Sequence, residues 1–229
     1  MQLKKIETAI NRYKAFLKSG SQHREVFPWE SQQIFQAHWN IDAPDFAAMY
    51  DAALQNSHTR RWWSGDNFAP KKRMLQFIHL NEDFVRTMFR ELFNESKPIA
   101  NRISKFQFGC DILLQDFKEA NPTSIENNHD HQENHLISLY LAFRYPSEYA
   151  VYFYPEFANL MKTIGSTKIP APYEMERFFK ITNTLTTFLY KDEELLQLHQ
   201  KNIQSDQLYQ LPSKLLVTDF YRFIGSEDE

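Results

Sequence analysis

Cysteine is almost absent from this sequence, because Cys110 is the only one among 229 residues. A lone cysteine forms no intramolecular disulfide, and we expect neither a zinc site built from several cysteines nor an iron–sulfur cluster. The composition therefore indicates a reducing, intracellular setting. We interpret Cys110 as a small core residue of an amphipathic helix, and not as a nucleophile.

Glycine is also scarce, and the five glycines are too scattered to form a phosphate-binding loop. Neither G-x-x-x-x-G-K-[ST] nor G-x-G-x-x-G occurs, and there is no G-x-S-x-G nucleophile elbow. The acidic runs "NED" (81–83) and "KDEE" (191–194) lie where helices are expected to start, so helix capping accounts for them. We therefore expect no catalytic residues and no cofactor in this chain.

Long hydrophobic runs are missing as well. No window approaches the roughly 18 apolar residues that a membrane-spanning helix needs. The N-terminal stretch "MQLKKIETAINRYKAFLK" is charged throughout, and it lacks the apolar core and the cleavage site of a secretory signal. We expect a soluble, cytoplasmic protein.

Aromatic residues are plentiful, with 20 Phe, 11 Tyr and 4 Trp making up 15% of the chain. Together with so few glycines, this favours long regular elements and a mainly α-helical fold. Apolar residues at three-and-four spacing predict helices that begin near Leu3, Pro28, Asp42, Pro70, Asn81, Ile99 and Leu136. The same spacing predicts further helices in 157–164, 172–190, 192–202 and 213–224.

One segment departs from the helical spacing. Residues 149–154 form a run of aromatic and β-branched side chains between two prolines, which is typical of a short strand. The expected fold class is thus mainly α: a multi-helix globular domain with at most a short β-hairpin or strand near 149–154.

Charge is distributed unevenly along the chain. Residues 1–120 hold 17 Lys and Arg against 14 Asp and Glu, whereas residues 121–229 hold 9 against 15. A polar, turn-rich segment lies between the two parts. We expect a net basic N-terminal helical half (1–120), a polar loop (121–130) and a net acidic C-terminal helical half (131–225), or one single domain over 1–225.

The densest group of basic residues lies in "HTRRWWSGDNFAPKKRML" (58–75), where five basic side chains accompany a single acid, Asp66. Lysines and arginines pair with phosphates and aromatic rings stack on bases, so this composition is typical of a nucleic-acid surface. The alternative is an anchored loop whose indoles plug the core before a helix that starts at Pro70. We expect at least one of the two tryptophans to be buried in the core and the basic side chains to be exposed to solvent.

The candidate DNA-binding residues share a basic or aromatic side chain and lie in this stretch or in the aromatic segment 140–157. They are Arg60, Arg61, Trp62, Trp63, Lys71, Lys72, Arg73 and Arg144.

The segment "HDHQENH" (129–135) is the one metal-like cluster. His131 and His135 share a face if a helix begins there, but Gln132 follows His131, so the segment does not match H-E-x-x-H. We interpret it as a polar interhelical loop that holds no metal. Whether His129, His131 and His135 bind a metal stays open, and a metal-dependent hydrolase built on this loop is a third functional alternative.

The order of the aromatic segments resembles a known family. The segments "WWSGDNFAPKKRMLQFIHLNEDFVRTMFRELF" (62–93), "HLISLYLAFRYPSEYAVYFYPEFANLMKTIG" (135–165) and "LPSKLLVTDFYRFI" (211–224) together resemble the N-terminal region of McrB-like AAA+ restriction proteins. The resemblance extends over about residues 12–224. In that family an N-terminal specificity region precedes a nucleotide-hydrolysing motor, which works with a separate McrC-type nuclease.

The resemblance implies a non-catalytic DNA-recognition domain of a modification-dependent restriction NTPase, whose motor domain is absent from this chain. It implies DNA with a modified or flipped base as the ligand, and it implies contact with the motor and the nuclease through the full-length protein. The alternative is a protein-interaction or adaptor module of a bacterial defence system, which the net charge of −3 and the acidic C-terminal half favour. Without the ring-forming motor, we expect a monomer.

Overall fold

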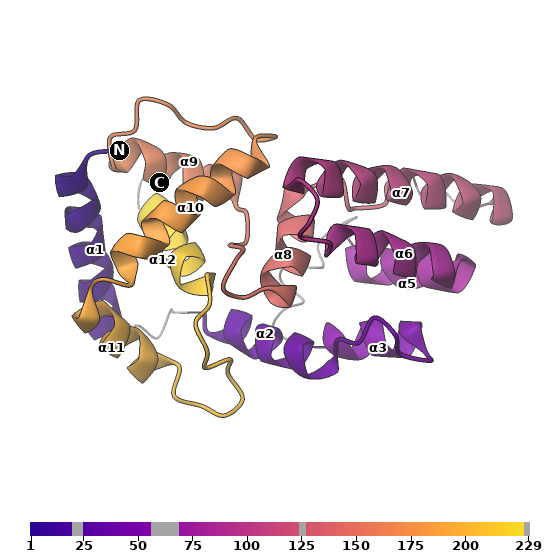
Figure 1. The fold of residues 1–229 in the computed structure, drawn as a ribbon, viewed down its shortest axis with the longest axis horizontal. Coiled ribbons are helices and arrows are strands. Elements are labelled where there is room, and N and C mark those ends of the chain that lie inside the picture. The colour runs from indigo at the N-terminus through magenta and orange to yellow at the C-terminus, as the bar shows by residue number, and fades with distance from the viewer. Residues whose placement is uncertain (20–24, 56–68, 124–126, 227–229) are drawn as a thin grey trace. The chain divides into compact units, whose positions relative to one another are not determined.

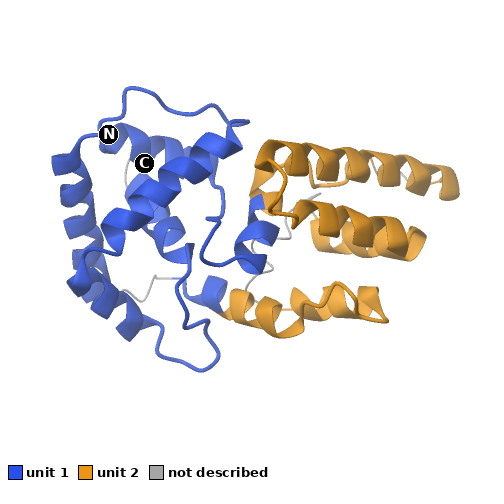
Figure 2. Ribbon diagram, in the orientation of Figure 1, with its two compact units in different colours: residues 1–29, 138–229 blue, residues 30–137 orange. Residues whose placement is uncertain are grey.

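The computed structural model describes residues 1–19, 25–55, 69–123 and 127–226, and these residues form helices and no strands. The chain divides into two compact units (Figure 2). Unit 1 comprises residues 1–29 and 138–229, and unit 2 comprises residues 30–137. This mainly α-helical architecture confirms the predicted fold class. None of the described helices is both long enough and apolar enough to cross a membrane.

Unit 1 is built from both ends of the chain (Figure 1). Its helices are α1 (Leu3–Lys18), α9 (Tyr154–Thr163), α10 (Met175–Leu189), α11 (Glu193–Asn202) and α12 (Leu215–Ser226). Helix α12 packs against α9, α10 and α1, and α1 also packs against α11. The first helix therefore belongs with the C-terminal part of the chain, so the two units do not follow the expected division at 121–130.

The core of unit 1 is aromatic. Phe157 on α9 contacts Phe178 on α10 and Tyr221 on α12 edge to face, with ring centroids 4.9 Å and 5.9 Å apart. All three side chains are at most 1% exposed. Gly225 allows α12 to approach α9 this closely, because a Cβ at that position would lie 2.0 Å from the carbonyl oxygen of Glu156.

Unit 2 contains α3 (Phe46–Ala53), α5 (Pro70–Leu80), α6 (Glu82–Leu92) and α7 (Ile99–Ala120). Helices α6 and α7 run side by side (Figure 1), and α5 packs against both. Phe89 on α6 is fully buried and meets the rings of Trp39 and Phe106, each at a centroid distance of 5.1 Å. Two helices, α2 (Phe27–His38) and α8 (Asn134–Arg144), contribute residues to both units.

Side chains cap the starts of α3, α6 and α11, and the start of α3 differs from the predicted one. Asn81 caps α6 and Asp192 caps α11, each by accepting a backbone N–H three residues further on, as the acidic runs predicted. The predicted start of α3 at Asp42 is wrong. The carboxylate that accepts the N–H of Ala48, at 2.8 Å, is that of Asp45, so the helix begins after Asp45.

Residues 149–153 belong to no helix and pair with no strand in the described part of the chain, and Phe153 at their end has extended backbone angles. Side chains of neighbouring helices satisfy their backbone instead. The N–H of Val151 donates to Thr218 Oγ1 at 3.1 Å, and the N–H of Tyr152 donates to Ser138 Oγ at 2.8 Å. The short strand that the composition suggested near 149–154 is therefore not formed in the described part of the chain, and side chains of α12 and α8 bond this backbone instead.

Candidate functional site

The tryptophan–arginine stretch lies outside the described residues. It includes Arg60, Arg61, Trp62 and Trp63, so their contacts with DNA and the burial of one indole stay predictions. The basic residues that follow this stretch are described, because they belong to α5.

Lys71 joins α5 to the end of α3. Its Nζ lies 2.8 Å from Asp51 Oδ1, and it donates to the carbonyl oxygens of Asp51 at 2.9 Å and Leu54 at 3.3 Å. These acceptors match the three hydrogens of an ammonium group, and the C-terminal end of a helix carries partial negative charge. These contacts give Lys71 a structural role in unit 2, and its contact with DNA stays a prediction.

Arg73 is held inside unit 2 and is only 5% exposed. Its Nη1 donates to Gln76 Oε1 at 2.8 Å, and its guanidinium carbon lies 5.2 Å from the centroid of the Phe117 ring. A buried charge is tolerated where hydrogen bonds and ring contacts replace its water. The guanidinium is buried between α5 and α7, so a phosphate in solvent cannot reach it. Arg73 is therefore no longer a candidate DNA contact.

Lys72 and Arg144 are both exposed. Lys72 lies in the first turn of α5, which contains no acidic side chain. Arg144 ends α8, and its guanidinium carbon lies 5.1 Å from the ring centroid of Tyr145. A ring beneath a guanidinium orders the side chain, and the planar N–H fork matches the geometry of a phosphate. Each unit thus presents one of the predicted basic residues to solvent.

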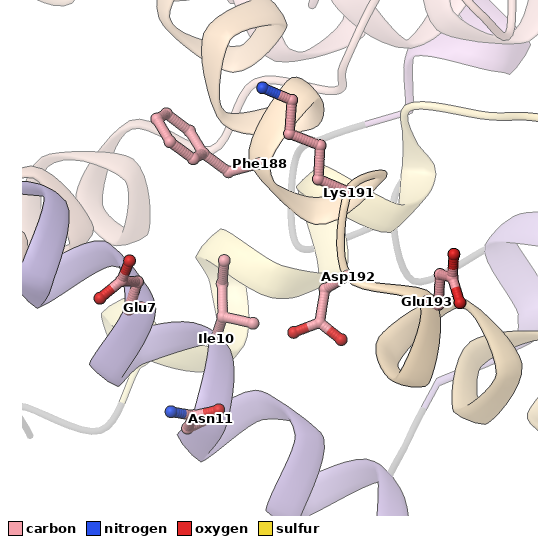
Figure 3. Close-up of a pocket in the computed structure, with 7 residues that line it drawn as sticks. All are labelled: Glu7, Ile10, Asn11, Phe188, Lys191, Asp192 and Glu193. Carbon is pink, nitrogen blue, oxygen red and sulfur yellow. The ribbon is translucent and has the colours of Figure 1, made fainter.

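An open pocket of about 600 Å³ lies in unit 1 between α1, the end of α10 and the start of α11 (Figure 3). Glu7, Lys191, Asp192 and Glu193 supply most of its polar lining. The carboxylate of Asp192 caps α11 and also lies 2.9 Å from Lys14 Nζ, a hydrogen bond that raises the pKa of Lys14. The carboxylate of Asp192 therefore stabilises the packing of α1 on α11, and we assign the pocket no ligand.

The lone cysteine meets two histidines in unit 2. Cys110 on α7 and the loop residues His129 and His131 are each 0% exposed, and Cys110 Sγ and one ring nitrogen of each histidine lie within 4.8 Å of one another. Burial raises the pKa of the Cys110 thiol, lowers the pKa of His129, and lowers that of His131 to about 3. At neutral pH the cluster is therefore a thiol with two uncharged imidazoles.

This grouping differs from the pair that helical spacing suggested. Helix α8 begins at Asn134, so His135 lies on that helix whereas His131 lies in the loop before it, and the two do not share a helix face. The burial of Cys110 confirms that it is a core residue. His129 and His131 lie in an interhelical loop, as we interpreted the segment, but both side chains are buried. No local pattern in the sequence indicated this grouping, because it depends on how the chain turns back between α7 and α8.

Comparisons with protein-family models, with curated proteins and with solved structures gave no significant match. The resemblance to McrB-like N-terminal regions therefore depends on the aromatic segments alone.

Proposed function

We propose that this chain is the DNA-recognition domain of an McrB-like modification-dependent restriction NTPase, and that it binds DNA without catalysing a reaction. The observation that carries the proposal is the exposed Lys72 in the first turn of α5, directly after the segment with Arg60, Arg61 and two tryptophans. First-turn residues lie beside backbone N–H groups that favour anions. Acidic side chains are usual in the first turn of a helix. A lysine in that position adds positive charge instead, and this positive charge favours a bound phosphate.

The two kinds of side chain in this segment have different roles in the proposal. Arg60, Arg61 and Lys72 neutralise phosphates, which supplies most of the affinity and makes it dependent on salt. Whichever indole of Trp62 and Trp63 lies outside the core stacks on an unpaired or flipped base. A cytoplasmic location, and the motor domain and McrC-type nuclease as partners through the full-length protein, belong to the same proposal.

The test is a fluorescence anisotropy titration of the intact chain with labelled duplexes that carry either modified or unmodified bases. We expect binding at low salt that weakens as salt rises, and we expect Lys72→Ser to weaken it. Lys105→Ser, which removes an exposed lysine from α7 and the same charge, is the matched control and leaves binding unchanged. A failure to bind every duplex at low salt would overturn the proposal.

A protein-interaction module is the second candidate, and one observation favours it. Phe108 and Ile112 lie one turn apart on α7 with 64% and 37% of their surface exposed. Neighbouring exposed apolar side chains mark protein-binding surfaces more often than isolated ones. If Phe108→Ser together with Ile112→Ser leaves DNA affinity unchanged while Lys72→Ser lowers it, the DNA proposal stands. If the chain binds no duplex, this second candidate replaces it.

A further inference from the structure

We infer that Cys110, His129 and His131 bind a single zinc ion inside unit 2, a function independent of DNA binding. One thiol and two imidazoles form a donor set that zinc prefers over harder cations, because zinc accepts both sulfur and nitrogen ligands. All three donors are buried, and their candidate ligand atoms lie within 4.8 Å of one another. They come from α7 and from the loop before α8, which a bound ion would join.

The hydrogen bonds of the two imidazoles define which nitrogen carries a lone pair. His131 Nδ1 lies 2.5 Å from the carbonyl oxygen of His129, an acceptor, so the proton is on Nδ1 and the lone pair is on Nε2. His129 Nδ1 accepts the backbone N–H of His131 at 3.0 Å, and its Nε2 lies 3.1 Å from Asp111 Oδ1. The proton of His129 is therefore on Nε2, and its lone pair is on Nδ1.

This pattern is the one that orients histidines at metal centres. A metal-binding imidazole typically donates its other N–H to a carboxylate or a backbone carbonyl, which fixes the tautomer and the ring orientation. Asp111 supplies such a carboxylate for His129, and the carbonyl of His129 supplies the acceptor for His131. A zinc ion at His129 Nδ1 would replace the hydrogen bond from the His131 backbone.

The loop that carries both histidines is attached to the helices on each side of it. Asp130 has a φ of 63°, a left-handed conformation that Asp tolerates, and its Oδ2 accepts the N–H of Ala69 just before α5 at 3.0 Å. Gln107 on α7 donates to the carbonyl oxygen of Gln132 at 2.8 Å. The fold therefore holds the imidazoles beside Cys110 without help from an ion.

Binding requires a small contraction and the loss of one proton. A zinc–sulfur bond is about 2.3 Å long and a zinc–nitrogen bond is about 2.0–2.1 Å long. Around a tetrahedral ion, the donor atoms therefore lie about 3.4–3.6 Å apart. Donor atoms that are up to 4.8 Å apart without the ion have to approach one another by about 1 Å. The S–H bond of Cys110 breaks, the sulfur–zinc bond forms, and the proton leaves to water. A tetrahedral zinc ion with three protein ligands takes a water molecule as its fourth ligand.

The experiment is a cobalt(II) titration of the intact, reduced chain, because cobalt(II) reports the ligands of a zinc site by its absorption. Thiolate coordination produces a charge-transfer band in the near ultraviolet, and Cys110 is the only cysteine, so this band can arise only here. We expect the band to saturate at one cobalt per chain and to vanish when one equivalent of zinc is added. A folded chain that shows no such band would overturn the inference.

Variants identify the other ligands. His131→Asn should lower the affinity for cobalt(II) by more than the roughly 10–100-fold expected for Asp111→Asn, which removes only the orienting carboxylate. His135→Asn is the matched control on α8 and leaves the titration unchanged. Unchanged affinity in folded His131→Asn would contradict the assignment. Circular dichroism establishes that each variant is folded, and the band of the parent chain decides the inference even if a variant is not.

Discussion

The ammonium group of Lys71 lies 2.8 Å from the carboxylate of Asp51, which joins α5 to α3 within unit 2. The next residue, Lys72, is exposed. Two adjacent lysines of one basic run thus have different surroundings, because Lys71 is held by α3 and Lys72 faces solvent.

Substitution of the two lysines should separate these roles. Lys71→Met removes a partly buried charge and leaves backbone carbonyls of α3 without their donor, so we expect a loss of about 1–2 kcal/mol in the free energy of unfolding. Lys72→Met should change it by less than about 0.5 kcal/mol, as exposed substitutions usually do. Urea denaturation measures both, and equal losses would contradict the assignment.

A second prediction concerns the non-helical segment 149–153. The Tyr221 hydroxyl accepts the N–H of Phe153 at 2.9 Å and donates to the carbonyl of Val151. Burial raises the pKa of Tyr221, so the hydroxyl keeps the proton that it donates. Tyr221→Phe leaves two buried backbone groups without this partner and should cost roughly 1–3 kcal/mol.

The control for that variant is Tyr173→Phe, because Tyr173 is 81% exposed and its hydroxyl is in solvent. Thermal or urea unfolding should show a change within about 0.5 kcal/mol for the control. A similar stability of the two variants would mean that the Tyr221 hydroxyl does not hold the segment.

Two helical glycines should respond differently to alanine. At Gly225 a Cβ would lie 2.0 Å from the backbone oxygen of Glu156, and backbone cannot move as a flexible side chain can. Gly225→Ala should therefore cost at least about 3 kcal/mol, the upper end of the usual range for overpacking. At Gly109 the Cβ would meet the end of the Met88 side chain at 2.8 Å.

Met88 can change rotamer, and alanine favours a helix over glycine by about 1 kcal/mol, so Gly109→Ala should change stability by less than about 1 kcal/mol. The difference between the two variants in denaturant midpoint is the measurement. A larger loss for Gly109→Ala than for Gly225→Ala would contradict the close approach of α12 to α9.

The tryptophan pair provides a fourth prediction. If at least one of Trp62 and Trp63 is buried, its replacement by Ala should cost about 3–5 kcal/mol, as other large core truncations do. Replacement of an indole that contacts DNA should leave stability unchanged and weaken binding. Stability that is unaffected by either single substitution would show that neither indole belongs to the core.

Much of the helical architecture was predictable because helices are specified by the spacing of apolar residues and by capping residues that are close together in the sequence. Three-and-four spacing located α1, α7 and α12, and Asn81 and Asp192 marked helix starts through their capping side chains. The start of α3 was less predictable, since both Asp42 and Asp45 can cap a helix and spacing does not distinguish them. Residues 149–153 had the composition of a strand, but whether a strand finds a partner depends on distant residues.

The candidate sites were less predictable than the helices, for the same reason. Arg73 and Lys72 are adjacent and chemically alike, and only the packing of α7 against α5 determines that Arg73 is buried. Cys110 meets His129 and His131 because the chain turns back between α7 and α8, and no local pattern records that contact. Spacing instead favoured His131 with His135, which would share a face only if the helix began earlier.

The salt dependence of DNA binding tests the central claim most directly. The measurement is the association constant of the intact chain for one labelled duplex over a series of salt concentrations, with a variant in which Arg60, Arg61 and Lys72 are all Ser. We expect the parent's logarithmic slope to become shallower in the variant by up to about 2.7, which is about 0.9 for each lost phosphate contact. No binding by the parent at low salt, or identical slopes for the parent and a folded variant, would contradict DNA recognition by this segment.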